Sequence, residues 1–105
     1  MLRIHDVMLG VIRKMRPLIV VIERRDDNLA RQLRASASSV TLNIAEGGGS
    51  FGGTRRERYR SALGSARETL SRLQTAEAFG YLDALPPGVL AGMRQVIGTL
   101  VHVAR

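Results

Sequence analysis

The spacing of aliphatic residues limits the folds open to this chain more than any other feature of its sequence. In four segments these residues recur every three or four positions, the interval that places side chains along one side of an α-helix. The first segment extends from about Ile4 to Arg24, and Pro17 inside it is expected to kink or split the helix. No segment alternates apolar and polar residues as a half-buried β-strand does. The sequence therefore predicts an all-α protein.

Turn-forming and helix-capping residues separate the four segments. Residues 26–28, Asp-Asp-Asn, have the turn and N-cap chemistry for the start of a second helix. That helix is expected to end in the glycine-rich stretch 47–53, interpreted as a flexible linker. Residues 54–57, Thr-Arg-Arg-Glu, match a capping box for a third helix that stops near Gly80, and a Pro-Pro-Gly break at 86–88 precedes the last helix. Four helices with mostly short connections predict an up-down-up-down antiparallel four-helix bundle.

Length and composition fit one domain, residues 1–105, with a core of aliphatic residues because aromatics are only 4% of the chain. The absence of cysteine excludes disulfides, thiolate metal sites and cysteine nucleophiles. The longest aliphatic run, Leu18 to Ile22, is far shorter than the roughly 20 residues of a membrane span. No signal peptide is visible. We therefore expect a cytoplasmic protein without a membrane partner.

The charge of the chain is strongly positive. Sixteen basic residues, all but one of them arginine, stand against nine acids and give a net charge of +7. Such a surface attracts polyanions, above all nucleic acid, because each neutralised phosphate releases condensed counterions. An arginine-rich proteome would explain the scarcity of lysine, but it would not explain the excess of bases over acids. The composition thus favours nucleic acid as a partner.

The arginines gather in two regions of the predicted bundle. One group lies on the side of the second helix opposite its core residues: Arg24, Arg31 and Arg34. The other crowds the first turns of the third helix and continues along its flank: Arg55, Arg56, Arg58, Arg60 and Arg67. Because arginine near a helix N-terminus opposes the helix dipole, this second group indicates an anionic partner, although acids at positions 26, 27 and 57 offer an alternative partner within the chain. We expect no aromatic platform among these arginines, so weakly sequence-specific backbone contacts are favoured over base stacking.

A second, uncharged polar stripe follows the second helix. Its members recur at spacings of four, three and four: Gln32, Ser36, Ser39 and Asn43. Small hydroxyl and amide side chains can hydrogen-bond across a close contact between helices. We interpret the stripe as an intersubunit or interhelix contact, and assign it to an oligomer interface; the alternative is a solvated polar face.

Catalytic and cofactor-binding patterns find little support. The glycine stretch imitates a P-loop, but Gly53 stands where the phosphate-binding lysine is required. No Glu-x-x-His motif is present for a di-iron site, and a meeting of His5, Asp6 and His102 at one end of the bundle is more simply a chance approach than a metal site. No serine stands in a nucleophile motif. Glu77 falls on the apolar side of the third helix and is interpreted as a structural, paired carboxylate.

Residues 29–47, which read LARQLRASASSVTLNIAEG, resemble a known family stretch of the form Q-[LM]-R-R-A-x-x-S-[IV]-x-x-N-I-A-E-G. Residues 58–73 and 78–82 resemble the third helix of the same family and the glycine-aromatic turn after it. The family is that of the four-helix-bundle proteins of 23S ribosomal-RNA intervening sequences, related to the accessory variability protein of diversity-generating retroelements. The resemblance implies a left-handed bundle that assembles into a barrel-like homopentamer. In the accessory protein the basic surface binds nucleic acid and a reverse transcriptase.

The chain departs from the family pattern at two places. Only one arginine, Arg34, directly precedes Ala35 where the family has two, and Arg31 lies one turn earlier. The family's Leu-Pro-x-x-Glu segment before the second helix is replaced by residues 26–28. These departures put a partner site at the junction of the first two helices in doubt and leave the bundle untouched.

Taken together, the sequence predicts a non-enzymatic, oligomeric, basic protein without a cofactor that binds the backbone of RNA or DNA as an accessory factor. The alternative is a scaffold module whose basic face meets an acidic protein partner such as a reverse transcriptase.

Overall fold

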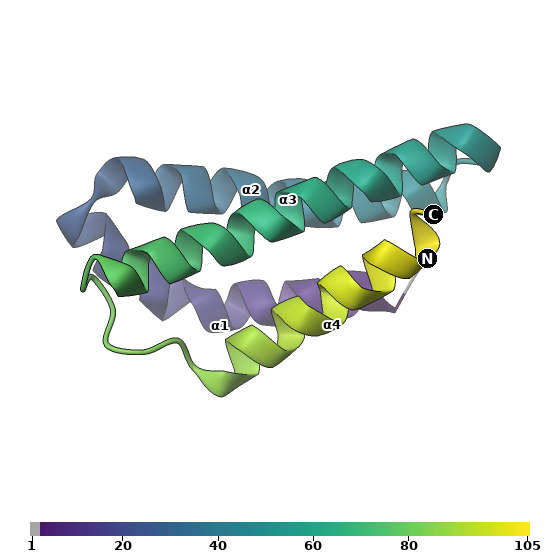
Figure 1. Ribbon diagram of the computed structural model, residues 1–105. Helices are drawn as coiled ribbons and strands as arrows, with labels where there is room; N and C mark the ends of the chain where they lie inside the picture. Colours follow the sequence, from purple (N-terminus) through teal and green to yellow (C-terminus); the bar gives the residue numbers. More distant parts are fainter. Residues whose placement is uncertain (1–2) are drawn as a thin grey trace.

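The computed structural model describes residues 3–105 and consists of four α-helices (Figure 1). Their bounds are Ile4–Arg25 for α1, Asp27–Gly48 for α2, Gly52–Ala78 for α3 and Pro87–Val103 for α4. Successive helices run in opposite directions, so that both termini lie at the same end of the molecule (Figure 1). Each helix packs against its two neighbours in the order α1–α2–α3–α4–α1. The predicted all-α, up-down-up-down bundle is confirmed.

Aliphatic side chains fill the centre of the bundle, as the composition predicts. Every helix contributes residues with almost no exposed surface; the largest of them are Met8, Met15, Ile22, Leu33, Ile44, Leu73, Met93 and Leu100. The apolar positions recur every three or four residues along each helix, so burial follows directly from the helical repeat. The remaining face of each helix is free to carry charge.

The junction of α1 and α2 forms as its sequence predicts. Asp26 alone separates the two helices, and its carboxylate accepts a hydrogen bond from the Leu29 amide at 2.9 Å, which satisfies one of the amides left free at a helix start. The α1 helix is not split at Pro17, whose side chain is exposed. The missing family segment before α2 is therefore replaced by an ordinary aspartate cap.

The junction of α2 and α3 differs from the sequence prediction. Only residues 49–51 separate the helices, so the glycine stretch is mostly helical and not a long linker. The predicted capping box is wrong, because α3 begins at Gly52, before Thr54, and its N-cap residue Phe51 makes no side-chain cap hydrogen bond. Gly52 has φ +56°, a left-handed conformation that glycine adopts without strain. Gly52 therefore makes a tight turn possible, in contrast to the flexible linker that was predicted.

The α3 helix ends at Ala78, close to the predicted stop, and Gly80 follows with φ +78° as helix C-termini often require. The prediction for Glu77 is wrong in its environment. Glu77 is exposed, and its carboxylate accepts a hydrogen bond from the Leu85 amide at 2.8 Å, so it fixes the loop to α4 instead of sitting on the apolar side. The reason is the nearby helix end, where the chain turns away from the core. Pro87 then occupies the first turn of α4, where its missing amide proton costs nothing.

Across residues 3–105, none of the helices combines the length and the apolar character needed to cross a membrane.

Candidate nucleic-acid interface

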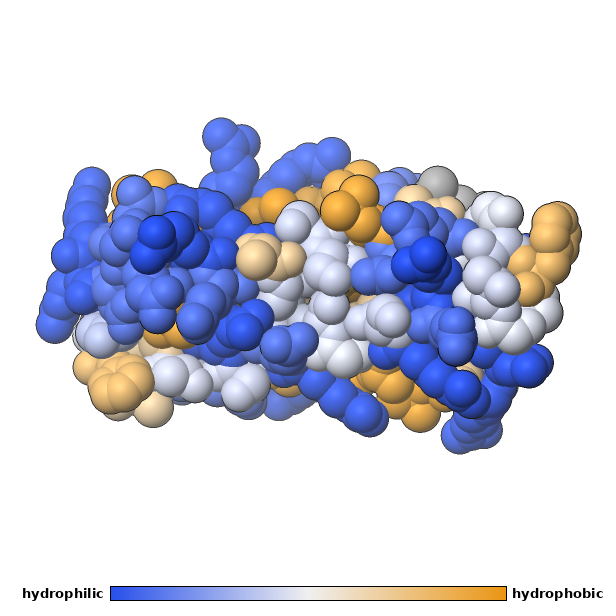
Figure 2. All heavy atoms as spheres, turned by 90° about the horizontal axis from the view of Figure 1, so that it is seen from above, coloured by the Kyte–Doolittle hydropathy of each residue, from blue (hydrophilic) through white to orange (hydrophobic). Residues whose placement is uncertain are grey.

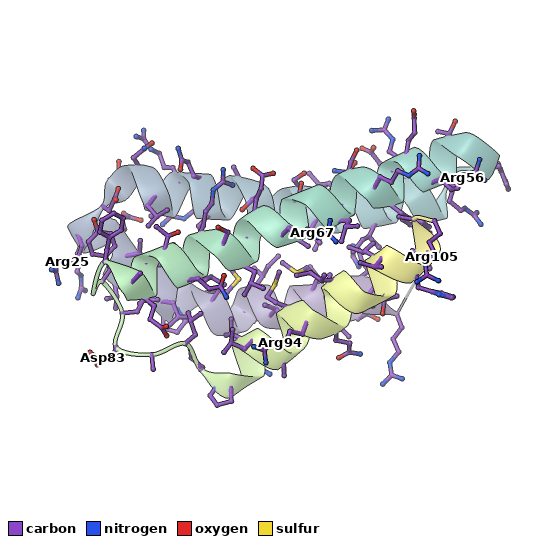
Figure 3. The ribbon with its side chains drawn as sticks, viewed as in Figure 1. Arg25, Arg56, Arg67, Asp83, Arg94 and Arg105 are labelled. Carbon is purple, nitrogen blue, oxygen red and sulfur yellow. The ribbon has the colours of Figure 1, made fainter. Side chains whose placement is uncertain are left out.

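The two ends of the bundle differ in their balance of charge. We call the end where α2 meets α3 and both termini lie the basic pole, and the end where α1 meets α2 and α3 meets α4 the opposite pole (Figure 1). Six arginines lie at the basic pole, Arg3, Arg55, Arg56, Arg58, Arg60 and Arg105, against three acids, Asp6, Glu46 and Glu57. Figure 3 shows Arg56 and Arg105 at this pole and Arg25 and Asp83 at the other. This pole therefore carries a surplus of three of the chain's seven net positive charges.

At the opposite pole, bases and acids nearly cancel. Seven basic residues, Lys14, Arg16, Arg24, Arg25, Arg31, Arg34 and Arg72, stand against six acids, Glu23, Asp26, Asp27, Glu68, Glu77 and Asp83. Figure 2, which views α2 and α3 from outside, shows hydrophilic residues gathered toward both poles with paler residues between them. The hydrophilic surface is thus common to both poles. The basic pole carries a surplus of three positive charges and the opposite pole a surplus of one, and the remaining three positive charges belong to Arg13, Arg67 and Arg94 between them.

The arginines predicted around α2 have partners inside the chain. Arg34 forms an ion pair with Glu23 of α1, and Arg31 lies 3.6 Å from the Asp27 carboxylate one turn earlier on α2. All four side chains are about half exposed or more, so these pairs contribute little stability, on the order of 0–1 kcal/mol each. They do reduce the charge available to a phosphate. Of this predicted group, Arg24 has no carboxylate at ion-pair distance within the described chain.

The arginines predicted on α3 fall into distinct environments. Arg55 turns back along the chain, and its Nε donates to the carbonyls of Ser50 at 2.8 Å and Gly47 at 3.1 Å. Arg58 pairs with Glu46 of α2 at 2.9 Å, which ties the two helices together at an exposed site. Arg55 therefore has a structural role in closing the α2–α3 turn, and no local pattern distinguishes it from the neighbouring arginines.

The remaining arginines of α3 are open to solvent. Arg60 is exposed, and its Nε donates to the Ala104 carbonyl at 3.0 Å. Arg56 and Arg67 are exposed, and no carboxylate among residues 3–105 lies at ion-pair distance from either. Figure 3 places Arg56 near the start of α3 and Arg67 near its middle, so the predicted flank follows the helix.

A shallow depression marks the outer face of α3 beside these arginines. It has a volume of about 520 Å³ and is lined by Thr54, Glu57, Arg58, Arg60 and Ser61. The lining offers hydroxyl and guanidinium donors together with one carboxylate, a combination suited to phosphate oxygens at its arginine edge. The basic pole thus has a concave surface that is lined by hydrogen-bond donors.

The sequence prediction missed an aromatic side chain at this pole. Phe51, in the α2–α3 turn, is 83% exposed, and the Arg55 guanidinium carbon lies over its ring, 5.6 Å from the centroid. Hydrophobic atoms project at this end of the molecule in Figure 2. The expectation that no aromatic residue accompanies the arginines is wrong, because the turn folds Arg55 back over a residue four positions earlier. The four-residue spacing between Phe51 and Arg55 was the sequence feature from which this contact could have been predicted.

The polar stripe of α2 faces α3 within the same chain. Ser36 and Thr69 hydrogen-bond through their hydroxyls at 2.9 Å, and Ser39 and Ser65 do the same at 2.8 Å. Asn43 donates to Ser39 at 3.1 Å. Ser36 is 5% exposed, which leaves almost no surface for a second subunit. These contacts correspond to the interhelix alternative for the inner part of the stripe.

The outer member of the stripe lies differently. Gln32 is exposed, and its carbonyl accepts a hydrogen bond from Arg72 of α3 at 3.2 Å. Its side chain therefore remains available, as do the half-buried outer edges of Ser39 and Asn43. An oligomer interface assigned to these residues stays a prediction.

An aromatic and cationic stack also forms at the opposite pole. Tyr81 stacks on Phe79 with ring centroids 5.5 Å apart, and Arg25 lies 5.7 Å from the Tyr81 centroid. The Tyr81 hydroxyl donates to Asp26 at 3.3 Å. Partial desolvation of the hydroxyl, and after it the Asp26 carboxylate, raise the pKa of Tyr81. The stack joins the α1–α2 junction to the loop after α3.

No group of three or more histidine, aspartate or glutamate side chains within residues 3–105 is arranged to hold a metal ion. His5, Asp6 and His102 are therefore not gathered into such a site, although the ends of α1 and α4 lie near each other (Figure 1).

The sequence pattern of the family described as 23S rRNA-intervening sequence protein matches residues 18–86, from the second half of α1 to the loop before α4. No curated protein and no solved structure matches the chain significantly. The matched region contains both predicted groups of arginines, the polar stripe and Phe51.

Proposed function

Because the chain belongs to the family of 23S rRNA-intervening sequence proteins, we propose that it is a basic accessory protein that binds nucleic acid through the phosphate backbone. The family description points to an association with RNA, and backbone contacts would extend to DNA. The proposed role is binding without catalysis and without a cofactor, because the residues that would act are arginines with no nucleophile or acid–base pair among them.

One observation carries the proposal: six arginines face three acids at the basic pole, whereas the opposite pole is nearly balanced. Four of these six, Arg3, Arg56, Arg60 and Arg105, are exposed and lie at ion-pair distance from no carboxylate side chain among residues 3–105. A cluster of like charges at a helix N-terminus is unfavourable by itself, by a few tenths of a kcal/mol for each arginine. Phosphates relieve this repulsion and release counterions as they bind.

The test compares two triple variants that remove the same charge. Arg56→Gln, Arg58→Gln and Arg60→Gln change the basic pole; Arg24→Gln, Arg31→Gln and Arg34→Gln change the opposite pole. Each triple lowers the net charge by three, from +7 to +4. Arg55 stays unchanged in both, since its hydrogen bonds to Gly47 and Ser50 hold the α2–α3 turn. The second triple is therefore a matched control for nonspecific electrostatic attraction.

The measurement is the affinity for a structured RNA and for duplex DNA over a series of salt concentrations. The basic-pole triple is expected to weaken binding and to reduce the salt slope by about 0.9 for each lost phosphate contact on the duplex. The control triple is expected to change both quantities much less, because two of its three arginines are already paired with acids. Equal affinity of the basic-pole triple and the unchanged protein would contradict the proposal.

Self-association is part of the proposal, and the resemblance implies a homopentamer. Its support is the exposure of large aliphatic residues on the sides of the bundle, Val20, Val21 and Leu42. When a second copy covers such residues, the burial of their apolar surface favours association. Light scattering at micromolar concentration checks this, and a mass of about 11.5 kDa would refute it.

The alternative function, a scaffold that binds an acidic protein such as a reverse transcriptase, uses the same basic pole. A pull-down separates the two: recovery of one protein partner that survives nuclease treatment favours the scaffold, and loss of all partners after nuclease favours nucleic acid.

A further inference from the structure

Phe51 is the most exposed of the large hydrophobic residues in the described chain, at 83%. It stands between the end of α2 and the first residue of α3, at the tip of the basic pole. A phenylalanine in water stabilises no core, and its contact with Arg55 covers only part of one ring face. The ring is therefore a surface feature that the packing of the bundle does not explain.

The turn that presents Phe51 is fixed by hydrogen bonds on both sides of it. The Arg55 Nε bonds the carbonyls of Gly47 and Ser50, and the Ser50 hydroxyl bonds the Glu46 carbonyl at 2.7 Å. The Ser50 amide also donates to the Gly47 carbonyl at 3.2 Å. Because the backbone around the ring is held in place, little conformational freedom remains to be lost when a ligand stacks on it.

One arginine contacts this ring, and others follow it in the first turns of α3. Arg55 lies over it, and the Arg56 guanidinium lies next to Gly53, where a Cβ built on the glycine would be 3.8 Å from its Nη2. The depression edged by Arg58 and Arg60 follows on the next turns of α3. The Phe51 ring and the phosphate-binding candidates thus share one end of the molecule.

We infer that the Phe51 ring stacks on an unpaired nucleobase while arginines of the basic pole bind the flanking phosphates. The inference rests on the proposed function and specifies its ligand as a loop or single-stranded segment. Every base has a π-face that an aromatic ring can cover, and in a duplex these faces are occupied by neighbouring base pairs. A second copy of the same pole is disfavoured as the occupant, since six arginines would face six arginines.

Three probes separate the possible ligands: an RNA hairpin with an unpaired loop, the DNA hairpin of the same sequence, and a blunt RNA duplex of equal phosphate number. Phe51→Ala is expected to weaken binding to the hairpins roughly 5- to 150-fold, the range of one base–aromatic stack, and to leave the duplex affinity and its salt slope unchanged. A preference for the RNA or the DNA hairpin identifies the nucleic acid. Because Phe51 is exposed, the fold of the variant, checked by circular dichroism, is expected to persist.

Phe79→Ala is the matched control. Phe79 is also an exposed phenylalanine, at 66%, and stacks on Tyr81 at the opposite pole, where the charges nearly cancel. Its removal is expected to change neither hairpin nor duplex affinity. Phe51→Trp provides a direct reporter, because the chain contains no tryptophan. Its fluorescence is expected to be quenched when hairpin is added and to stay constant with the duplex.

Equal hairpin affinity for Phe51→Ala and the unchanged protein, with binding still weakened in the basic-pole triple, would overturn the stacking inference and leave the proposed function standing. Absence of binding to all three probes would overturn both. A fall in oligomer mass for Phe51→Ala, or a protein partner retained only by the unchanged chain after nuclease treatment, would assign the ring to a protein contact and overturn the inference.

Discussion

Gly47, the glycine of the Asn-Ile-Ala-Glu-Gly stretch, lies buried in the last turn of α2 against a ring from α3. A Cβ built at this position would lie 2.3 Å from Cε1 of Tyr59, 2.7 Å from Cδ1 and 3.0 Å from Cζ. Nonbonded carbon atoms prefer about 3.5–4.0 Å, so Gly47→Ala requires the ring or the helices to move by about 1 Å. Tyr59 is only 5% exposed, so a shift of its ring has to displace other packed groups.

The magnitude follows from two opposing terms. Overpacking of a close-packed site typically costs about 1–3 kcal/mol. Alanine in a helix is favoured over glycine by about 0.5–1 kcal/mol, and less at a helix end. We therefore expect Gly47→Ala to lower the free energy of unfolding by about 1–2 kcal/mol. For a chain of this size the melting temperature should fall by roughly 4–16 °C.

Urea denaturation followed by circular dichroism measures this change. Gly64→Ala is the matched control, because Gly64 is an exposed glycine within α3 whose Cβ would meet no atom within 4 Å. It should stabilise the protein by about 0.5–1 kcal/mol. In a Tyr59→Leu background the clash is removed, so the penalty of Gly47→Ala should largely disappear. If Gly47→Ala matches or exceeds the stability of Gly64→Ala, the steric reasoning is refuted.

Two further substitutions test the junctions of the bundle. Asp26→Ala should lower the free energy of unfolding by about 0.5–2 kcal/mol, because the Leu29 amide loses its cap and the Tyr81 hydroxyl loses its acceptor. Asp26→Asn should retain most of the cap. Equal thermal stability of the two variants would contradict this assignment. Thr69→Val should cost about 0.5–1.5 kcal/mol, since it removes the buried hydroxyl bonded to Ser36. In denaturant unfolding, the combined variant Ser36→Ala and Thr69→Val should lose less than the sum of its parts, whereas full additivity would mean that the two hydroxyls do not interact.

Much of the fold could be predicted from local features. The helical repeat gave the four helices, Asp26 gave the start of α2, and Gly80 gave the end of α3. Each of these features depends on residues within one or two helical turns of each other, so it can be predicted from neighbouring positions in the sequence. The sequence predictions were wrong where another interaction took precedence over a local pattern. The capping box at Thr54 did not form, because Arg55 bonds backbone carbonyls of the preceding turn and α3 begins earlier.

The candidate site was less accessible to sequence reasoning. The excess of arginine and its two groups were visible in the chain, but which guanidinium groups stay free was not. Arg34 meets Glu23 of α1, and Arg58 meets Glu46 of α2, across contacts that exist only after the helices pack. Arg55 closes the α2–α3 turn and lies over the Phe51 ring, whereas Arg56 stays exposed at the same pole.

The sequence by itself thus determined a four-helix, basic protein, because helix formation and net charge depend on residue types and their spacing. Only the tertiary structure decided that the arginines at the start of α3 lie at the same pole as Arg3 and Arg105, that the α2 stripe meets α3, and that Gly47 must lack a side chain. The physical reason is distance in the chain. Ser36 and Thr69 are 33 positions apart, and their contact depends on how closely two helices approach, which in turn depends on all the side chains packed between them.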